Sequence, residues 1–372
     1  MIKNICYITY QTFPASTANS LQTISNIKYF IKNKCDVSLI YPLREKSSSS
    51  SIEEIQDFYN TSIPININGV EHNYPFGKIK FFEGLMFHIS HYLWAKKTVK
   101  KVEDSIYDFY ITRSDWIFYF LLKKTNKRVI FECHKVSKLR KIILRFCLKK
   151  SNAKVIYLNK NLMNIFSKFN TEMNTIVLHN GVDLDDFKNS NNLNKNMDII
   201  FIGNLQRFSK SRNIKFAIDG FVKSKLSNSF SLKIIGGPED ISNSLRDYVN
   251  ENYENENIKI LGQLGRIEAK NSLNKARVGV LINDNKDEHS YLHSSPLKYF
   301  EYLASNLKVV APDFPAHREL PYSENIIFFN HDNLKSFSNA LEQSLIEEIK
   351  YIDLDKISLD YRIKKILEFI DK

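Results

Sequence analysis

The sequence contains few cysteines: four in 372 residues, at positions 6, 35, 133 and 147. They form no metal-ligand pair, and their scatter fits a reducing compartment better than a disulfide scaffold. An apolar run of about 18 residues, long enough to cross a bilayer, is also lacking, because one Glu and two His residues interrupt the longest candidate, 81–94. The start of the chain shows no cleavage site of a signal peptide. These absences predict a cytoplasmic globular protein.

The composition is ordinary, but the charge is unevenly distributed. Residues 1–187 contain 27 Lys and Arg against 16 Asp and Glu, whereas residues 188–372 contain 26 against 25. The basic first half favours an anionic partner such as a membrane surface, a phosphorylated acceptor or nucleic acid. Lysines that serve only solubility would explain the same imbalance. The length of the chain predicts two or three domains.

Apolar strand-like segments alternate with amphipathic helical segments, a pattern typical of parallel sheets in α/β layers. The Asn-rich run 189–196 reads as a linker between two such patterns. The strands predicted are 4–10, 36–41, 108–113, 128–133, 153–158, 175–180, 197–203, 231–237, 257–262, 278–283, 308–313 and 325–330. The helices predicted include 19–33, 212–226, 266–276, 295–305, 334–349 and 355–371. Two doubly wound domains facing a cleft are expected, with ligands beyond the carboxyl ends of the strands.

The most informative segment is 294–320, SSPLKYFEYLASNLKVVAPDFPAHREL. Its two serines suit a helix N-cap and Pro296 suits a first helical turn. The free backbone N–H groups of such a helix start attract phosphate. Lys298 adds positive charge one turn in, and Glu301 on the same side could accept two hydrogen bonds from a ribose. An ordinary capped helix with a surface Lys–Glu pair would explain the same residues.

This segment resembles the donor-site signature of GT-B glycosyltransferases of the retaining family 4 type, the glycosyl transferases group 1. Ser-Pro-Leu-Lys, Phe-Glu-Tyr and Val-Val-Ala occur in the family's order, and 317–320 resembles its closing element. The resemblance implies that Glu301 binds the nucleotide ribose and that the helix start meets the diphosphate. His293 stands where the family often has a Glu that touches the donor sugar. The donor-site residues implied are His293, Ser295, Pro296, Leu297, Lys298 and Glu301, together with Gly203 and Asn204 from an earlier segment.

A second segment, 202–213, places basic residues directly after a strand. Such residues could neutralise a diphosphate leaving group. The family usually has an Arg just after the glycine that corresponds to Gly203, but here Asn204 occupies that position. Because the loop is about one residue longer, Lys210 is assigned the catalytic role and Arg207 is the second choice. A solvated basic loop is the alternative.

In the first half, IFECHK at 130–135 ends a predicted strand. It resembles the Glu-x-His that follows a central strand of the family's N-terminal domain, which implies that His134 faces the donor sugar and acceptor. Histidine can position or deprotonate a hydroxyl near neutral pH. A purely structural His134 fits the same pattern.

The loop 12–22 carries Ser16, Thr17 and Asn19, where relatives often have two glycines. Small polar residues still allow close backbone approach, so these three are candidates for an acceptor or phosphate loop. A plain N-cap at Asn19 or Ser20 explains the segment nearly as well.

Two further segments have competing interpretations. HNGVDLDDF at 179–187 resembles the family's interdomain hinge, and that context argues against reading Asp183 and Asp185 as a metal-binding pair. The run 135–154 is basic and amphipathic, with its apolar residues predicted on one side. Such a helix can dock on anionic lipid headgroups, or pack on the sheet with a solvated basic face. Its predicted apolar side comprises Leu139, Ile142, Ile143, Phe146 and Cys147.

Together these features predict a GT-B fold of two Rossmann-like domains. Residues 1–183 would bind the acceptor and 184–353 the nucleotide sugar, while 354–372 would form a helix that crosses back to the first domain. The expected reaction moves a sugar from a nucleotide-diphosphate sugar to a glycan or lipid-linked acceptor in cell-surface polysaccharide synthesis. The resemblance implies retention of configuration and no required metal or cofactor. Contact with the inner face of the cytoplasmic membrane is expected through the basic half.

Three alternatives remain open. A nucleotide-sugar 2-epimerase would share the fold but would need more acid–base residues than the sequence offers. A catalytically inactive homologue that binds glycans or acts as a scaffold subunit would explain His293 and Asn204. A nucleic-acid binder would fit the charge, but no recognised module is present.

Overall fold

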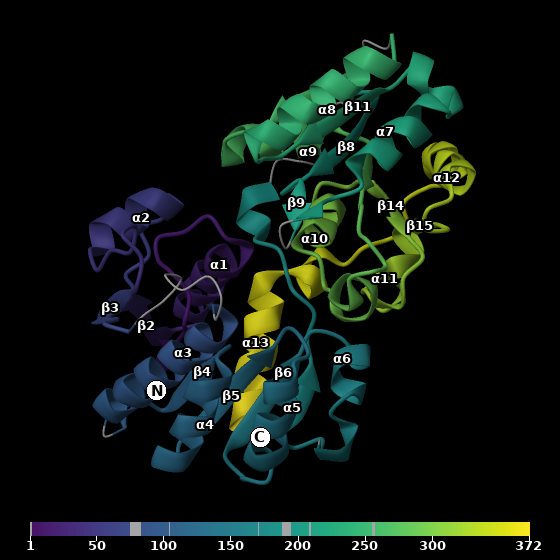
Figure 1. Cartoon of the computed structure of the whole chain (residues 1–372). Helices are drawn as coiled ribbons and strands as arrows, with labels where there is room; N and C mark the ends of the chain where they lie inside the picture. Colours follow the sequence, from purple (N-terminus) through teal and green to yellow (C-terminus); the bar gives the residue numbers. More distant parts are fainter. Residues whose placement is uncertain are drawn as a thin grey trace. The chain divides into compact units, whose positions relative to one another are not determined.

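The computed structural model describes residues 2–74, 83–103, 105–169, 171–187, 195–207, 210–254 and 257–372, without the side chains of 207, 210 and 211. The chain forms two compact units. Unit 1 comprises Met1–Leu178 and Leu359–Lys372, and unit 2 comprises His179–Ser358 (Figure 1).

Unit 1 contains a seven-stranded parallel sheet in the order β3-β2-β1-β4-β5-β6-β7. The strands are β1 (Lys3–Ile8), β2 (Cys35–Leu43), β3 (Asn66–Glu71), β4 (Phe109–Thr112), β5 (Arg128–Cys133), β6 (Ala153–Tyr157) and β7 (Thr175–Val177). Ile5 of β1 lies opposite Val37 of β2 and Phe109 of β4. The order reverses between β1 and β4, and ligands of doubly wound sheets bind at such a point.

Helices cover both faces of this sheet. They are α1 (Ala18–Lys32), α2 (Ile52–Tyr59), α3 (Glu83–Val102), α4 (Asp115–Lys124), α5 (Lys138–Cys147), α6 (Lys160–Asn164) and α13 (Leu359–Asp371). Alternate residues of β1 enter different cores because strand side chains point to opposite faces. Cys6 and Ile8 pack with α3, α4 and α5, whereas Ile5 and Tyr7 pack with α1, α2 and α13. The C-terminal helix α13, yellow in Figure 1, is therefore part of the core of unit 1.

Unit 2 contains a six-stranded parallel sheet in the order β12-β11-β8-β13-β14-β15. The strands are β8 (Asp198–Ile202), β11 (Ser231–Ile235), β12 (Ile258–Gly262), β13 (Val278–Val280), β14 (Lys308–Pro312) and β15 (Ile326–Phe329). An antiparallel hairpin of β9 (Gln206–Arg207) and β10 (Lys210–Ser211) follows β8. The order reverses between β8 and β13, which marks the corresponding ligand edge of this sheet.

The helices of unit 2 also form two layers. They are α7 (Ile214–Val222), α8 (Glu239–Asn252), α9 (Arg266–Lys275), α10 (Leu297–Ala304), α11 (Pro315–Arg318) and α12 (Leu334–Ile346). Residues of α7, α8 and α12 share one core with the sheet, and residues of α9 and α10 share the other. The predicted α/β class with parallel sheets is confirmed.

Several predicted elements need correction. The predicted helix 355–371 begins only at Leu359, after a short 3-10 turn. Within the basic run 135–154, the helix α5 covers only Lys138–Cys147, and the run ends in the strand β6, which begins at Ala153. Within the described residues, no helix has both the length and the apolar character needed to cross a membrane.

Candidate functional site

The carboxyl ends of β8 and β11 approach each other so closely that only glycine fits. Gly203 has a φ of +131°, and a Cβ there would lie 2.8 Å from Lys298 Nζ. Gly236 has a φ of +156°, and a Cβ there would lie 1.9 Å from the carbonyl oxygen of Gly203. Residues with side chains rarely adopt these backbone conformations. The two glycines therefore leave the backbone uncovered at this edge of the sheet and leave room for the Lys298 ammonium group beside it.

The helix start that the sequence singled out is present, but its cap differs from the prediction. Pro296 is the N-cap of α10 and no side chain caps the helix. Ser295 is instead tied to Asn180, whose backbone N–H donates to Ser295 Oγ at 3.0 Å. Ser294 Oγ donates to the Ser290 carbonyl. Since neither serine caps α10, its first N–H groups lack a side-chain acceptor, and such groups attract anions.

Glu301 lies one turn into α10, among positive groups. Burial raises the pKa of its carboxyl, against the opposing effect of Arg266, Lys298 and Lys270. Arg266 and Lys270 of α9 both pair with Asp186, at 2.8 and 2.5 Å. A half-buried carboxylate in this position could accept hydrogen bonds from a diol, as the sequence predicts for the ribose.

The remaining predicted donor residues are spread along the same unit. His293 is buried at the end of a short π-helical turn, His289–His293. Asn204 is exposed, and its side-chain oxygen accepts a hydrogen bond from the Gln206 N–H at 2.8 Å. Arg207 and Lys210 pair through the β9–β10 hairpin, but their side chains lie outside the described residues. Their catalytic roles stay predictions.

In unit 1, Glu132 lies at the carboxyl end of β5 and is completely surrounded by donors. Tyr7 Oη, Arg113 Nε and Arg362 Nη2 each donate to its carboxylate at 2.8 Å. Burial alone would raise the pKa of Glu132, but the guanidinium groups of Arg113 and Arg362 hold that pKa well below its usual value. The guanidinium groups thus favour an ionised Glu132, which links β1, the residue after β4 and α13, over an acid–base catalyst.

His134 lies directly beyond this carboxylate. Burial, reinforced by the neighbouring Arg113, holds the pKa of its imidazole well below the ordinary value. The ring is therefore neutral near pH 7, and its Nε2 has no hydrogen-bond partner among the described residues. A neutral imidazole with an available nitrogen can orient or accept a proton from a hydroxyl.

The loop after β1 also differs in detail from its prediction. Thr17 caps α1, because its Oγ1 accepts a hydrogen bond from the Ser20 N–H at 3.3 Å. The alternative N-caps Asn19 and Ser20 are therefore wrong. Ser16, Thr17 and Asn19 are exposed.

The Asp-x-Asp of the predicted hinge forms a local turn. Asp183 Oδ1 accepts a hydrogen bond from the Asp185 N–H at 3.2 Å. In the part of the chain that the structure describes, no three His, Cys, Asp or Glu side chains are grouped as metal ligands.

Comparison with known proteins now gives this arrangement a family. Residues 196–347 match the family model described as glycosyl transferases group 1. This segment of unit 2 therefore resembles a group 1 glycosyltransferase domain. The predicted transferase class is thereby confirmed. No curated protein sequence matches the chain.

Solved structures show that the whole chain has a GT-B fold. One is the apo form of the lipopolysaccharide outer core galactosyltransferase WaaB, at 12% identity and a TM-score of 0.66, with 99% of each chain covered. A second is a mutant of TarM from S. aureus, at 13% identity and a TM-score of 0.68, with 100% of each chain covered. A third is a UDP-forming α,α-trehalose-phosphate synthase from Burkholderia xenovorans, at 11% identity and a TM-score of 0.65, with 100% of each chain covered. The GT-B prediction is confirmed.

The sequence reasoning missed important parts of this glycosyltransferase. It did not single out Arg113 or Arg362, although an arginine at the end of the predicted strand 108–113 was a usable signal for Arg113. Arg362 is 230 positions from Glu132 and gave no such signal. Gly236 was included only as part of the predicted strand 231–237, and its close contact with Gly203 was not foreseen.

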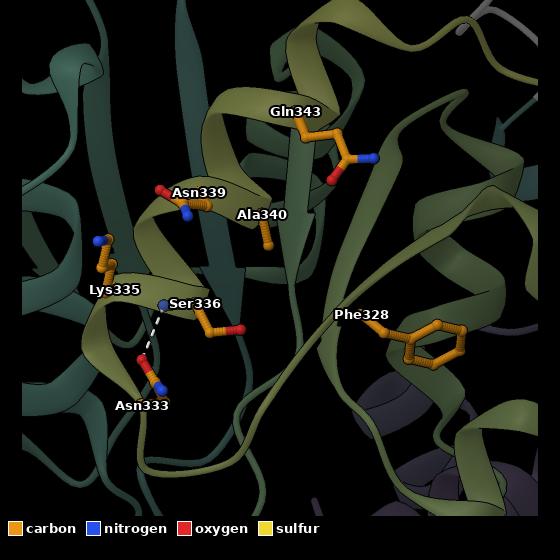
Figure 2. Close-up of a pocket in the computed structure, with 7 residues that line it drawn as sticks. All are labelled: Phe328, Asn333, Lys335, Ser336, Asn339, Ala340 and Gln343. Carbon is orange, nitrogen blue, oxygen red and sulfur yellow. Dashed lines mark hydrogen bonds between the residues drawn. The ribbon is translucent and has the colours of Figure 1, made fainter.

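One surface pocket lies away from these residues. It has a volume of about 310 Å³ and follows α12 and the end of β15. Figure 2 shows its lining residues, with Asn333 accepting a hydrogen bond from the Ser336 N–H at the start of α12. Its only charged lining residue is Lys335, and it contains none of the predicted site residues. We therefore place no chemistry in this pocket.

Proposed function

We propose that the chain transfers a sugar from a nucleoside-diphosphate sugar to a glycan or lipid-linked acceptor, with retention of configuration and no required metal. The observation that carries this proposal is the uncapped start of α10, which lies in the same unit as the Gly203–Lys298 contact and Glu301. The TarM structure contains UDP, and so does a complex of an α-glucosyltransferase with DNA. These ligands support a nucleotide donor in unit 2.

In the proposed reaction, positive groups stabilise the diphosphate as it leaves. The N–H groups of α10, Lys298 and the predicted Lys210 would take up the charge that develops on the leaving group. These positive groups would neutralise the diphosphate in place of a bridging metal ion. His134 would orient the acceptor hydroxyl. Unit 1 is accordingly the proposed acceptor domain.

The test is a nucleotide panel read by thermal unfolding. UDP, GDP, ADP, CMP and inorganic phosphate are added with Mg²⁺ or with EDTA. We expect one nucleoside diphosphate to raise the midpoint of unit 2 by mass action, equally in both conditions. Glu301→Gln should abolish this rise, whereas Glu251→Gln, an exposed control on α8, should keep it. No shift with any nucleotide would favour an inactive, glycan-binding or scaffold subunit.

A membrane contact is the second part of the proposal. On α5, Ile142 and Phe146 are 55% and 59% exposed, whereas Ile143 and Cys147, predicted on the same apolar side, are buried. Arg140, predicted on the charged side, is instead buried and paired with Asp115. The exposed surface of α5 therefore combines apolar and basic groups, as anionic lipid requires. Its basic members are Lys138, Lys141 and Arg145, continued by Lys149 and Lys150.

A further inference from the structure

Three buried arginines lie near the carboxyl edge of the sheet in unit 1. Arg113, Arg140 and Arg362 are all at least nine-tenths buried, with side-chain exposures of 8%, 5% and 3%. Glu132 and Asp115 are the two carboxylates that pair with them. Among the described residues, Arg113 pairs only with Glu132, a carboxylate that also pairs with Arg362, and buried charges are costly unless they are paired.

The three arginines differ in how completely their donors are used. Arg140 donates to both carboxylate oxygens of Asp115, at 2.7 and 3.0 Å, and to the Lys135 carbonyl at 2.7 Å. Arg113 donates only through Nε, at 2.8 Å, to Glu132, which it shares with Arg362. Its Nη1 and Nη2 are buried and have no hydrogen-bond acceptor in the part of the chain that the structure describes. The unused half of the Arg113 fork therefore offers two N–H donors to a further anion.

The position of this fork is that of a ligand site. Arg113 directly follows β4, at the point where the strand order reverses between β1 and β4. Ligands of doubly wound sheets bind beyond the carboxyl ends at such a point. His134, the proposed acceptor-orienting group, follows the neighbouring strand β5 and also has an unused ring nitrogen. Two parallel N–H donors of a guanidinium match phosphate in a bidentate manner.

We propose that Arg113 binds a phosphate group of the acceptor and so places the acceptor beside His134. The assignment to the acceptor rests on the proposed function, because it takes unit 1 as the acceptor domain. The recognised chemistry is a phosphate group, which a phosphorylated sugar or a lipid phosphate could supply. The competing explanation is that the ion pairs serve only to hold α13 on the sheet.

The two tryptophans of the chain make unit 1 selectively visible. Trp94 and Trp116 both lie in this unit, so intrinsic tryptophan fluorescence reports its unfolding and circular dichroism reports both units. The protein is titrated with sodium phosphate and, separately, with sodium chloride of equal ionic strength. We expect phosphate to raise the fluorescence midpoint by about 5 °C at saturating concentrations. Chloride should have a much smaller effect.

The variants separate a phosphate site from a purely structural ion pair. Arg113→Gln should lose the phosphate-dependent rise, whereas Arg140→Gln, equally buried but fully paired, should keep it. Arg113→Lys retains the charge without the fork and should show a reduced rise, which covers the case in which Arg113→Gln does not fold. A wild-type midpoint that ignores phosphate, or a rise that persists in both Arg113 variants, would overturn the proposal.

Two further arms identify the source of the phosphate and keep the two proposals apart. Glucose 6-phosphate and vesicles that carry phosphatidic acid are compared with inorganic phosphate, and a larger rise with either would name the source. UDP, read by circular dichroism, tests unit 2. A UDP response without a phosphate response would sink only the Arg113 assignment. A phosphate response without any nucleotide response would leave the anion site and sink the donor assignment.

Discussion

Unit 2 builds its candidate site largely from backbone, whereas unit 1 builds its own from charged side chains that are distant in the sequence. In unit 2, the start of α10 presents N–H groups, and Gly203 and Gly236 allow the main chain to pack closely. In unit 1, Glu132 gathers Arg113 and Arg362 from two other elements. Two sheets of similar topology are therefore stabilised at their ligand edges by different kinds of contact, main-chain packing in unit 2 and buried ion pairs in unit 1. This difference predicts that different kinds of substitution should damage each unit.

The largest effect is expected at the centre of the charged network. Glu132→Gln removes the one carboxylate that serves two buried guanidinium groups, and breaking such a pair costs about 3–5 kcal/mol. The free energy of unfolding of unit 1, followed by tryptophan fluorescence in urea, should fall by this amount. Circular dichroism should show a second transition that is unchanged, because unit 2 does not contain the network.

A matched surface pair sharpens this prediction. Asp371 on the same helix, α13, pairs with Lys3 at 2.6 Å, but it is 62% exposed. Asp371→Asn should cost less than about 1 kcal/mol, because solvent screens exposed ion pairs. Equal losses in the Glu132 and Asp371 variants would show that burial does not distinguish the two contacts.

The next effect belongs to the backbone of unit 2. In Gly236→Ala the new Cβ would collide with the Gly203 carbonyl, and the φ of +156° would become strained. We expect a loss of about 3 kcal/mol in the transition seen by circular dichroism but not by fluorescence, together with loss of the nucleotide response. Gly84→Ala is the control, since the new methyl group meets nothing within 4 Å in α3. It should stabilise unit 1 by roughly 0.5–1 kcal/mol.

A change in the fluorescence midpoint of Gly236→Ala would contradict the independence of the two units. The backbone of unit 2 would then matter for the stability of unit 1. The two sites would have to be treated as one cooperative structure.

The same contrast explains how much could be predicted from the sequence. The helix start at 296–301 is contiguous, so its residues could be read together, and the strands with dense apolar runs were found. β3 was missed because its residues Asn66–Glu71 are half exposed, as at a sheet edge, and contain few apolar side chains. α8 was missed because its buried residues, Ser242, Leu245 and Val249, include only two apolar side chains.

The side-chain network of unit 1 could not be predicted in the same way. Glu132 and His134 were found because they follow a strand, but their partners come from other parts of the chain. Arg113 is 19 positions away and Arg362 is 230 positions away. Such contacts arise from tertiary packing, which local patterns do not encode. The buried Arg140 was misplaced for the same reason, since Asp115 on α4 holds it.

The smallest effect concerns the surface of unit 1 and tests whether its charge has a use outside the site. Replacing both Ile142 and Phe146 on α5 by Ser should weaken binding to vesicles that contain phosphatidylglycerol by about tenfold, because two apolar side chains lose their burial in the lipid interface. Ile346→Ser is the control, since Ile346 is 82% exposed but precedes Glu347 and Glu348. Sedimentation with the vesicles measures the binding of both variants.

Because the attraction depends on the surrounding lysines and arginines, binding should also fall in high salt and on neutral vesicles. Unchanged binding of the double variant would assign the basic charge of unit 1 to solubility or to its acceptor alone.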